Sequence, residues 1–198
     1  MKRSLVVALC VLLASSVSVF GAPARAAAQE FDLPPLEQDL VDGYEVMQAV
    51  TMGLLSVTAV GGLVQLYNLP TSFGDGACDE GNAIFGEYAC RGDLSLVHAV
   101  LGIASIAAYT ATAALALTAP DLDAFRNEDG VTDALGVVHG VGIGLTPAIG
   151  LLAANPSLIG LSGQTAEDFS RHMRVVHWLV GAVTLVAFAT HMAVDYID

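Results

Sequence analysis

Charged residues are scarce in this chain, and basic residues are the scarcest of all. Only 14% of the 198 residues are charged, and 20 aspartates and glutamates outnumber seven lysines and arginines, for a formal net charge of −13. Proteins that bind nucleic acid need basic side chains to contact the phosphates. The composition therefore argues against nucleic acid as a partner.

Cysteines and catalytic motifs are few as well. The chain has three cysteines and lacks the H-E-x-x-H, P-loop and G-x-S-x-G motifs of several large enzyme classes. Its long apolar segments beyond the N-terminus contain no cysteine, and no aspartate or glutamate lies near their centres. These absences argue against a zinc site and against a proton pathway through a membrane.

Apolar residues, in contrast, are abundant and occur in long runs. They make up 55% of the chain, and the mean hydropathy is +0.65. Four runs of about 20 residues or more can each cross a hydrocarbon core about 30 Å thick; they span 44–67, 94–118, 135–154 and 175–195. We therefore predict an all-α fold, an up-and-down bundle of four transmembrane helices in a lipid bilayer.

The N-terminus has the pattern of a secretory signal peptide over residues 1–28. Lys2 and Arg3 precede an apolar core over residues 5–20, and alanines at 26–28 provide an A-x-A cleavage site. The alternative is an uncleaved membrane anchor. Cleavage would place the mature N-terminus on the exported side of a bacterial-type inner membrane.

This signal also predicts how the bundle lies in the membrane. The acidic segment 29–43 would be exported, and the four helices of the domain 44–198 would return the C-terminus to the same side. Loops 68–93 and 155–174 would then face the cytoplasm. They hold three of the four arginines beyond the signal, which agrees with the positive-inside rule.

Two cysteines close together in one loop bear on this orientation. Cys78 and Cys90 are 12 residues apart, and in an exported protein such a pair suggests a disulfide. The orientation above places both in a reducing compartment, which argues against that bond. We prefer the orientation based on the signal and the arginines, and the cysteine pair is the strongest observation against it.

Histidines inside the apolar segments are the most informative feature of the chain. His177 and His191 lie 14 residues apart in the last segment. Fourteen residues are nearly four helical turns, so both imidazoles point the same way, about 21 Å apart along the helix. Ionisable side chains inside a membrane are costly and usually mark a functional site.

Helix direction predicts a partner for each of these histidines. His98 lies at the depth of His177, near the cytoplasmic face, and His139 lies at the depth of His191, near the exported face. We call His98 with His177 the first pair, and His139 with His191 the second pair. Neutral imidazole is a common axial ligand of haem iron. The sequence therefore predicts two b-type haems, each between the histidines of one pair.

Residues near the first pair fit this hypothesis. Gly102 and Gly181 lie one turn inward of the two histidines, where a missing side chain would leave room for a flat macrocycle. Arg91 and Arg174 lie near the same end and are suited to neutralise haem propionates. For the second pair, Arg126 is the only arginine on that side of the membrane.

A weak internal repeat links alternate helices. The pattern V-H-x-x-x-G occurs at 97–102 and again at 176–181, and residues 48–53 can be aligned with 139–144. The chain thus has the pattern of a duplicated helical hairpin.

These histidine positions resemble those of four-helix membrane di-haem cytochromes b. The 14-residue spacing of His177 and His191 resembles the cytochrome b subunits of formate dehydrogenases and nickel–iron hydrogenases. The sequences V-H-A-V-L-G around His98 and H-G-V-G-I-G-L-T-P-A-I-G from His139 resemble cytochrome b561 domains. The resemblance covers about residues 94–195. The chain departs from the first group in having Gln48 on helix one, and from the second in having two histidines on one helix.

We therefore expect an integral membrane cytochrome that carries electrons between the membrane faces, with enzymatic activity belonging to a larger complex. Its electron donor or acceptor would be a quinone, a partner subunit or a soluble carrier. Two alternatives remain at this point. One is a haem-free membrane protein, a structural subunit or small transporter, whose histidines pack or handle protons. The other is a single-haem sensor or assembly subunit that uses only the first pair.

Overall fold

The computed structural model describes residues 35–90, 92–118 and 130–197. The predicted signal peptide, Arg91 and Arg126 lie outside these residues. The described part of the chain is helical and contains no strand. Its long helices are α2 (Pro35–Asn68), α4 (Asp93–Thr118), α5 (Gly130–Ala154) and α6 (Gly163–Ile197), with a short α3 (Glu87–Cys90) and a 3₁₀ turn, η2 (Pro156–Ile159).

The four predicted apolar helices are confirmed, but most begin earlier than the hydropathy indicated. Helix α2 begins at Pro35, a residue that suits the first turn of a helix because it lacks a backbone donor that would be unpaired there. The first two turns of α6 are polar, so the apolar pattern missed them. Helix α5 continues through Pro147.

All four long helices are long and apolar enough to cross a membrane. Their outward faces carry many large apolar residues, among them Val57 on α2, Ile103 on α4, Val137 on α5 and Val186 on α6, each more than half exposed. A soluble bundle would bury such residues, whereas lipid solvates them. The described helices therefore indicate a multi-pass membrane protein.

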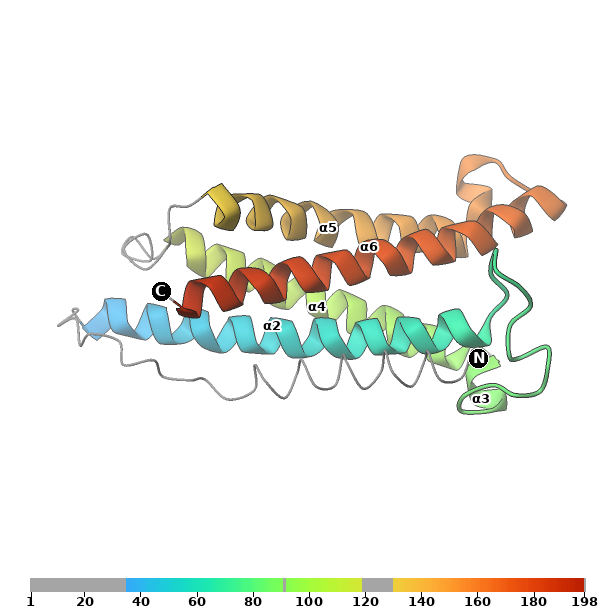
Figure 1. Ribbon diagram of the computed structural model, residues 1–198, viewed down its shortest axis with the longest axis horizontal. Coiled ribbons are helices and arrows are strands. Elements are labelled where there is room, and N and C mark those ends of the chain that lie inside the picture. Colours follow the sequence, from blue (N-terminus) through green and yellow to red (C-terminus); the bar gives the residue numbers. More distant parts are fainter. Residues whose placement is uncertain (1–34, 91, 119–129, 198) are drawn as a thin grey trace.

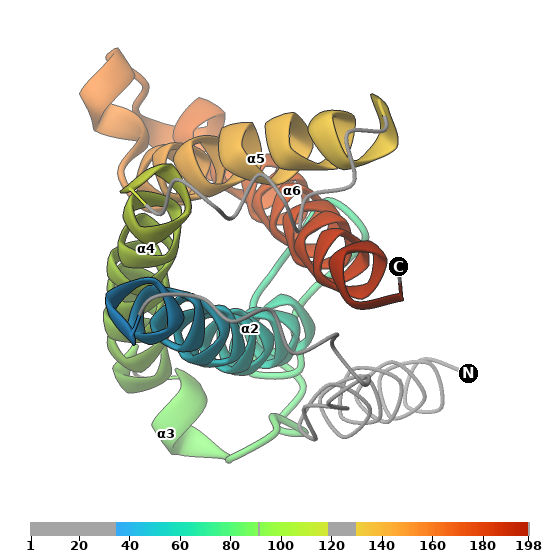
Figure 2. The same cartoon turned by 90° about the vertical axis from the view of Figure 1, so that its left-hand side faces the viewer.

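The helices pack as two hairpins, α2 with α4 and α5 with α6, and the contact of α2 with α6 joins the hairpins. Figures 1 and 2 show the four helices side by side, with α2 next to α4 and α5 next to α6. The apolar core lies where α2 meets α6 and is formed by Met52, Leu185, Phe188 and Met192.

The interior also holds polar side chains, beside further apolar ones such as Leu63 and Val64. Within the first hairpin, the hydroxyls of Thr51 and Thr112 are hydrogen-bonded at 2.9 Å, and those of Thr58 and Ser105 at 3.1 Å. Interhelical hydrogen bonds of this kind contribute about 0.6 kcal/mol each in membrane proteins. Buried hydroxyls that pair across helices are expected of helices that pack in lipid.

The connection between α2 and α4 is a compact cap. Asn68, 1% exposed, donates its side-chain amide to the carbonyl of Ile84 and accepts the backbone N–H of the same residue, both at 2.9 Å. A disulfide joins Cys78 to Cys90. This bond answers a question that the sequence left open, and it is at odds with an orientation that places the cap in a reducing compartment.

Candidate functional site

The structure brings together both histidine pairs that the sequence predicts. In the first pair, His98 of α4 and His177 of α6 are half-buried, with ring centroids 5.8 Å apart and the rings nearly perpendicular. In the second pair, His139 of α5 and His191 of α6 have ring centroids 4.9 Å apart. The histidines of each pair come from different helices.

One hydrogen bond fixes the tautomer of His177. Its Nδ1 lies 2.8 Å from the backbone carbonyl oxygen of Thr146 on α5. A carbonyl oxygen can only accept, so Nδ1 carries the proton and donates it. The lone pair of the neutral ring is therefore on Nε2. Histidines that bind metals usually show this arrangement, in which the nitrogen that does not bind the metal donates to a carbonyl or carboxylate.

Glycines on α2 and α5 allow the backbone to approach the first pair closely. A Cβ atom at Gly150 would lie 2.8 Å from Cε1 and 2.9 Å from Nδ1 of His177, and one at Gly62 would lie 3.1 Å from Cε1 of His98. Sequence reasoning missed both glycines, because it looked for clearance on the helices that carry the histidines. A repeated T-x-x-x-G pattern, Thr58 to Gly62 and Thr146 to Gly150, was the available signal.

The two glycines that the sequence did single out lie elsewhere. A Cβ atom at Gly102 would meet no other residue within 4 Å, and one at Gly181 would approach Cγ2 of Thr146 at 3.5 Å. Neither glycine lies against an imidazole in this structure. Space beside Gly102 remains compatible with a flat ligand, whereas Gly181 serves the contact of α6 with α5.

Two buried donors or acceptors near the first pair lack a hydrogen-bond partner. They are Nδ1 of His98 and the indole Nε1 of Trp178. Buried polar atoms are rarely left without partners, and exceptions often mark a site that a ligand completes.

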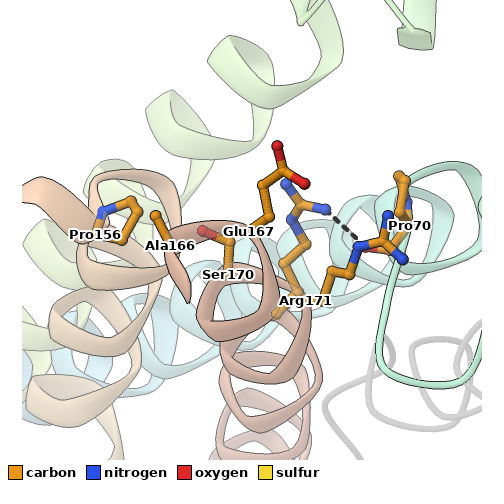
Figure 3. Close-up of a pocket in the computed structure, with 7 residues that line it drawn as sticks. Pro70, Pro156, Ala166, Glu167, Ser170 and Arg171 are labelled. Atoms are coloured by element: carbon orange, nitrogen blue, oxygen red, sulfur yellow. Dashed lines mark hydrogen bonds between the residues drawn. The ribbon is translucent and has the colours of Figure 1, made fainter. Parts of the chain in front are cut away.

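Arg174 lies one turn before His177 on α6. Its guanidinium is half-buried and donates to the carbonyl oxygen of Pro70 at 2.6 Å. It lines an open pocket of about 290 Å³ at the cap end of the bundle, beside Arg171 and the side chain of Glu167. Figure 3 shows the polar side chains of α6 gathered at this pocket. Among the described contacts, its guanidinium meets Pro70 and neither imidazole of the first pair, so its role beside that pair stays a prediction.

The second pair is closed by a direct hydrogen bond. Nε2 of His139 and Nδ1 of His191 are 2.6 Å apart. His139 is 7% exposed and also contacts the hydroxyl of Tyr109 on α4, which lies 2.9 Å from its Nδ1. A Cβ atom at Gly136 would lie 3.6 Å from Cε1 of His191, an ordinary contact distance, so this position does not require glycine. Sequence reasoning missed Tyr109.

The contacts reveal the register of the internal repeat. Gly62 and Gly150, 88 residues apart, lie against His98 and His177, which are 79 residues apart. The same offsets relate the bonded pair Thr51 and Thr112 to His139 and His191. The alignment of α2 with α5 is therefore shifted by three residues from the one that the sequence suggested. Thr51, not Gln48, corresponds to His139.

Within the described residues, no three histidine, cysteine or acidic side chains gather in a way that could hold a metal ion. Paired imidazoles, in contrast, are the axial ligand set of a six-coordinate haem. No protein-family model, curated protein or solved structure matches the chain. The function is therefore inferred from the geometry of the two pairs.

Proposed function

We propose that this protein is a b-type membrane cytochrome that carries electrons through the bundle. The observation that carries the proposal is the Nδ1 bond of His177 to the Thr146 carbonyl, which leaves the lone pair of the neutral ring on Nε2, in a ring whose centroid lies 5.8 Å from that of His98. In a membrane interior, two neutral imidazoles at one level have few roles other than packing or binding a cofactor.

The residues of the first pair would suit a haem. The two rings come from different helices and their centroids are 5.8 Å apart, so His98 and His177 could each offer a nitrogen to a group held between them. The unpartnered Nε1 of Trp178 and the Arg174 guanidinium would supply donors for acidic groups of the haem. When bound, haem would supply one-electron chemistry.

The second pair fits less closely. Its two nitrogens are 2.6 Å apart and directly hydrogen-bonded, so the rings would have to separate before a metal ion could bind between them. His139 is oriented as a metal ligand would be, because its Nδ1 is hydrogen-bonded to the Tyr109 hydroxyl and its Nε2 faces His191. His191 instead presents Nδ1, and its ring would have to turn. This observation favours one second candidate, a single-haem sensor or assembly subunit that uses only the first pair.

The proposal includes an arrangement in the membrane. The helices form an up-and-down bundle in the inner membrane, behind a cleaved signal peptide, with both mature termini exported. The predicted cleavage site and the arginines of loops 68–93 and 155–174 support this orientation. The disulfide between Cys78 and Cys90 is the observation against it. A quinone, a partner subunit or a soluble carrier would complete the electron path.

Haem counting tests the proposal. The protein, purified in detergent from a haem-replete host, should show a sharp b-type α band on reduction and two haems per chain by pyridine haemochrome. His177→Ala and His191→Ala should each remove one haem. His172→Ala is the matched control, since this exposed residue of α6 bonds only the carbonyl of Asp168 within its own helix, and it should keep both.

Each other outcome is informative. One haem per chain, lost in His177→Ala and kept in His191→Ala, would support the single-haem candidate. A colourless protein from a haem-replete host would refute both, and would leave the histidines as packing groups.

A further inference from the structure

Arginines are scarce in this chain, yet two of them line one pocket. Beyond residue 28 the chain has four arginines and no lysine. Arg171 and Arg174 line the open pocket of about 290 Å³ at the cap end of the bundle (Figure 3). Arginines at the end of a transmembrane helix also orient it in the membrane, but orientation requires only their charge. Their place in a shared pocket indicates a binding site for an anionic group.

The pocket is formed mainly by one face of α6. Four of its lining residues follow one another at intervals of three or four along this helix, so their side chains project from the same side; they are Glu167, Ser170, Arg171 and Arg174. Pro70 of the cap and Pro156 of η2 also line it. Pockets for drug-sized ligands measure about 300–1,000 Å³. This one, at about 290 Å³, therefore suits a small polar group.

Both guanidinium groups have donors for such a ligand. Arg174 donates one N–H to the carbonyl oxygen of Pro70 at 2.6 Å, and a guanidinium carries five N–H groups. Arg171 lies 3.8 Å from a carboxylate oxygen of Asp75, whose side chain is 73% exposed, so this ion pair is weak. Arginine binds phosphate strongly, because its planar fork of N–H groups matches the phosphate oxygens.

A carboxylate in the same pocket restricts which phosphate compound would bind. Glu167 lines the pocket together with the two arginines. The whole chain has a formal net charge of −13, which opposes a purely anionic ligand. A ligand that carries both a phosphate and an ammonium group would match the charges of both signs. The headgroup of phosphatidylethanolamine has these two groups.

The surroundings of the pocket favour a lipid as the source of this group. Arg174 is followed directly by the apolar part of α6, on which Leu179 is exposed. Pro156 is followed in η2 by Leu158 and Ile159, and both are exposed. Exposed apolar side chains beside a polar pocket are typical of membrane contacts. Acyl chains attached to a headgroup in the pocket would be solvated by such side chains.

We propose that this pocket binds the headgroup of a zwitterionic phospholipid, with Arg171 and Arg174 on its phosphate and Glu167 on its ammonium group. A soluble phosphate ester with the same two groups shares this chemistry, so the test has to separate the two sources. The inference goes beyond the proposed function and does not depend on haem.

Native mass spectrometry of the delipidated full-length protein in detergent tests this inference. The probes are phosphatidylethanolamine, phosphatidylglycerol and soluble phosphoethanolamine. We expect one phosphatidylethanolamine per chain, bound more tightly than either of the other two. Arg171→Gln should lower its affinity by about tenfold or more, as the loss of a charge-assisted hydrogen bond does. Glu167→Gln should weaken phosphatidylethanolamine and not phosphatidylglycerol, because phosphatidylglycerol has no ammonium group.

Asn82→Asp is the matched control. It changes the net charge by the same amount as Arg171→Gln, on an exposed side chain of the cap that does not line the pocket. It should bind phosphatidylethanolamine as the wild type does. Circular dichroism of Arg171→Gln should show wild-type helix content, so that a loss of binding is not a loss of folding.

Three results would overturn the inference. The first is wild-type affinity for phosphatidylethanolamine in Arg171→Gln. The second is an equal loss of affinity in Arg171→Gln and Asn82→Asp, which would show that only the net charge matters. The third is binding of soluble phosphoethanolamine as tight as that of the lipid, which would make the ligand a soluble phosphate ester.

Discussion

Gly150 offers the sharpest prediction, because its substitution by alanine should be harmful in a position where alanine is otherwise favoured. In a helix interior alanine is more favourable than glycine by about 1 kcal/mol. A Cβ atom at residue 150, however, would lie 2.8 Å from Cε1 and 2.9 Å from Nδ1 of His177. Non-bonded carbon atoms prefer about 3.5–4.0 Å, so the ring would have to retreat by about 0.7 Å.

This displacement of the His177 ring would lengthen the hydrogen bond that holds it. The bond from Nδ1 of His177 to the Thr146 carbonyl is 2.8 Å long, and a displacement of about 0.7 Å would bring it to the limit of a hydrogen bond. Its loss costs about 0.5–1.5 kcal/mol. Loss of such a partner lowers metal affinity by about 10- to 100-fold. We therefore expect Gly150→Ala to lower haem affinity at the first pair by about that factor.

The assay is haemin titration of the haem-free protein, followed by pyridine haemochrome after washing. Gly144→Ala is the control on the same helix, since a Cβ atom there meets nothing within 4 Å, and it should bind haem as the wild type does. Gly150→Ala with the wild-type number of haems, unchanged affinity and an unchanged spectrum would refute the reasoning. It would mean that the His177 ring is not held where its hydrogen bond indicates.

Two further predictions concern the cap. Asn68→Ala should remove both hydrogen bonds to the half-buried backbone of Ile84, each worth about 0.5–1.5 kcal/mol. Limited proteolysis should then cut the cap faster while haem content stays unchanged, and an unaltered cleavage rate would contradict the role of Asn68. With exported termini, a membrane-impermeant maleimide applied after an impermeant reductant should label Cys78 and Cys90 only in opened membranes. Labelling in intact spheroplasts would reverse the orientation.

The pairing of the histidines could be predicted from the sequence alone. Four histidines in three apolar segments, together with helix direction, grouped His98 with His177 and His139 with His191, and the structure places the same residues side by side. Depth in a membrane follows from counting residues at a fixed rise, so it needs no knowledge of packing. Their role as haem ligands remains a prediction.

Counting residues along each helix could not predict the contacts between helices. The sequence assigned clearance to Gly102 and Gly181, which lie on the helices of the histidines, whereas Gly62 and Gly150 on the facing helices lie against the rings. Which residue faces a ring depends on the rotation and crossing of two helices, and hydropathy does not record rotation when all faces are apolar. Tyr109 escaped notice for the same reason.

The sequence by itself determined the class of the molecule, a helical membrane protein with four histidines inside its apolar segments, because apolar length and residue spacing are properties of one chain segment at a time. Only the tertiary structure decided which partners each imidazole has. It assigned the Thr146 carbonyl to His177 and the Tyr109 hydroxyl to His139. It also closed the second pair by a direct hydrogen bond. Such bonds join residues of different helices, so they depend on how the helices pack against one another.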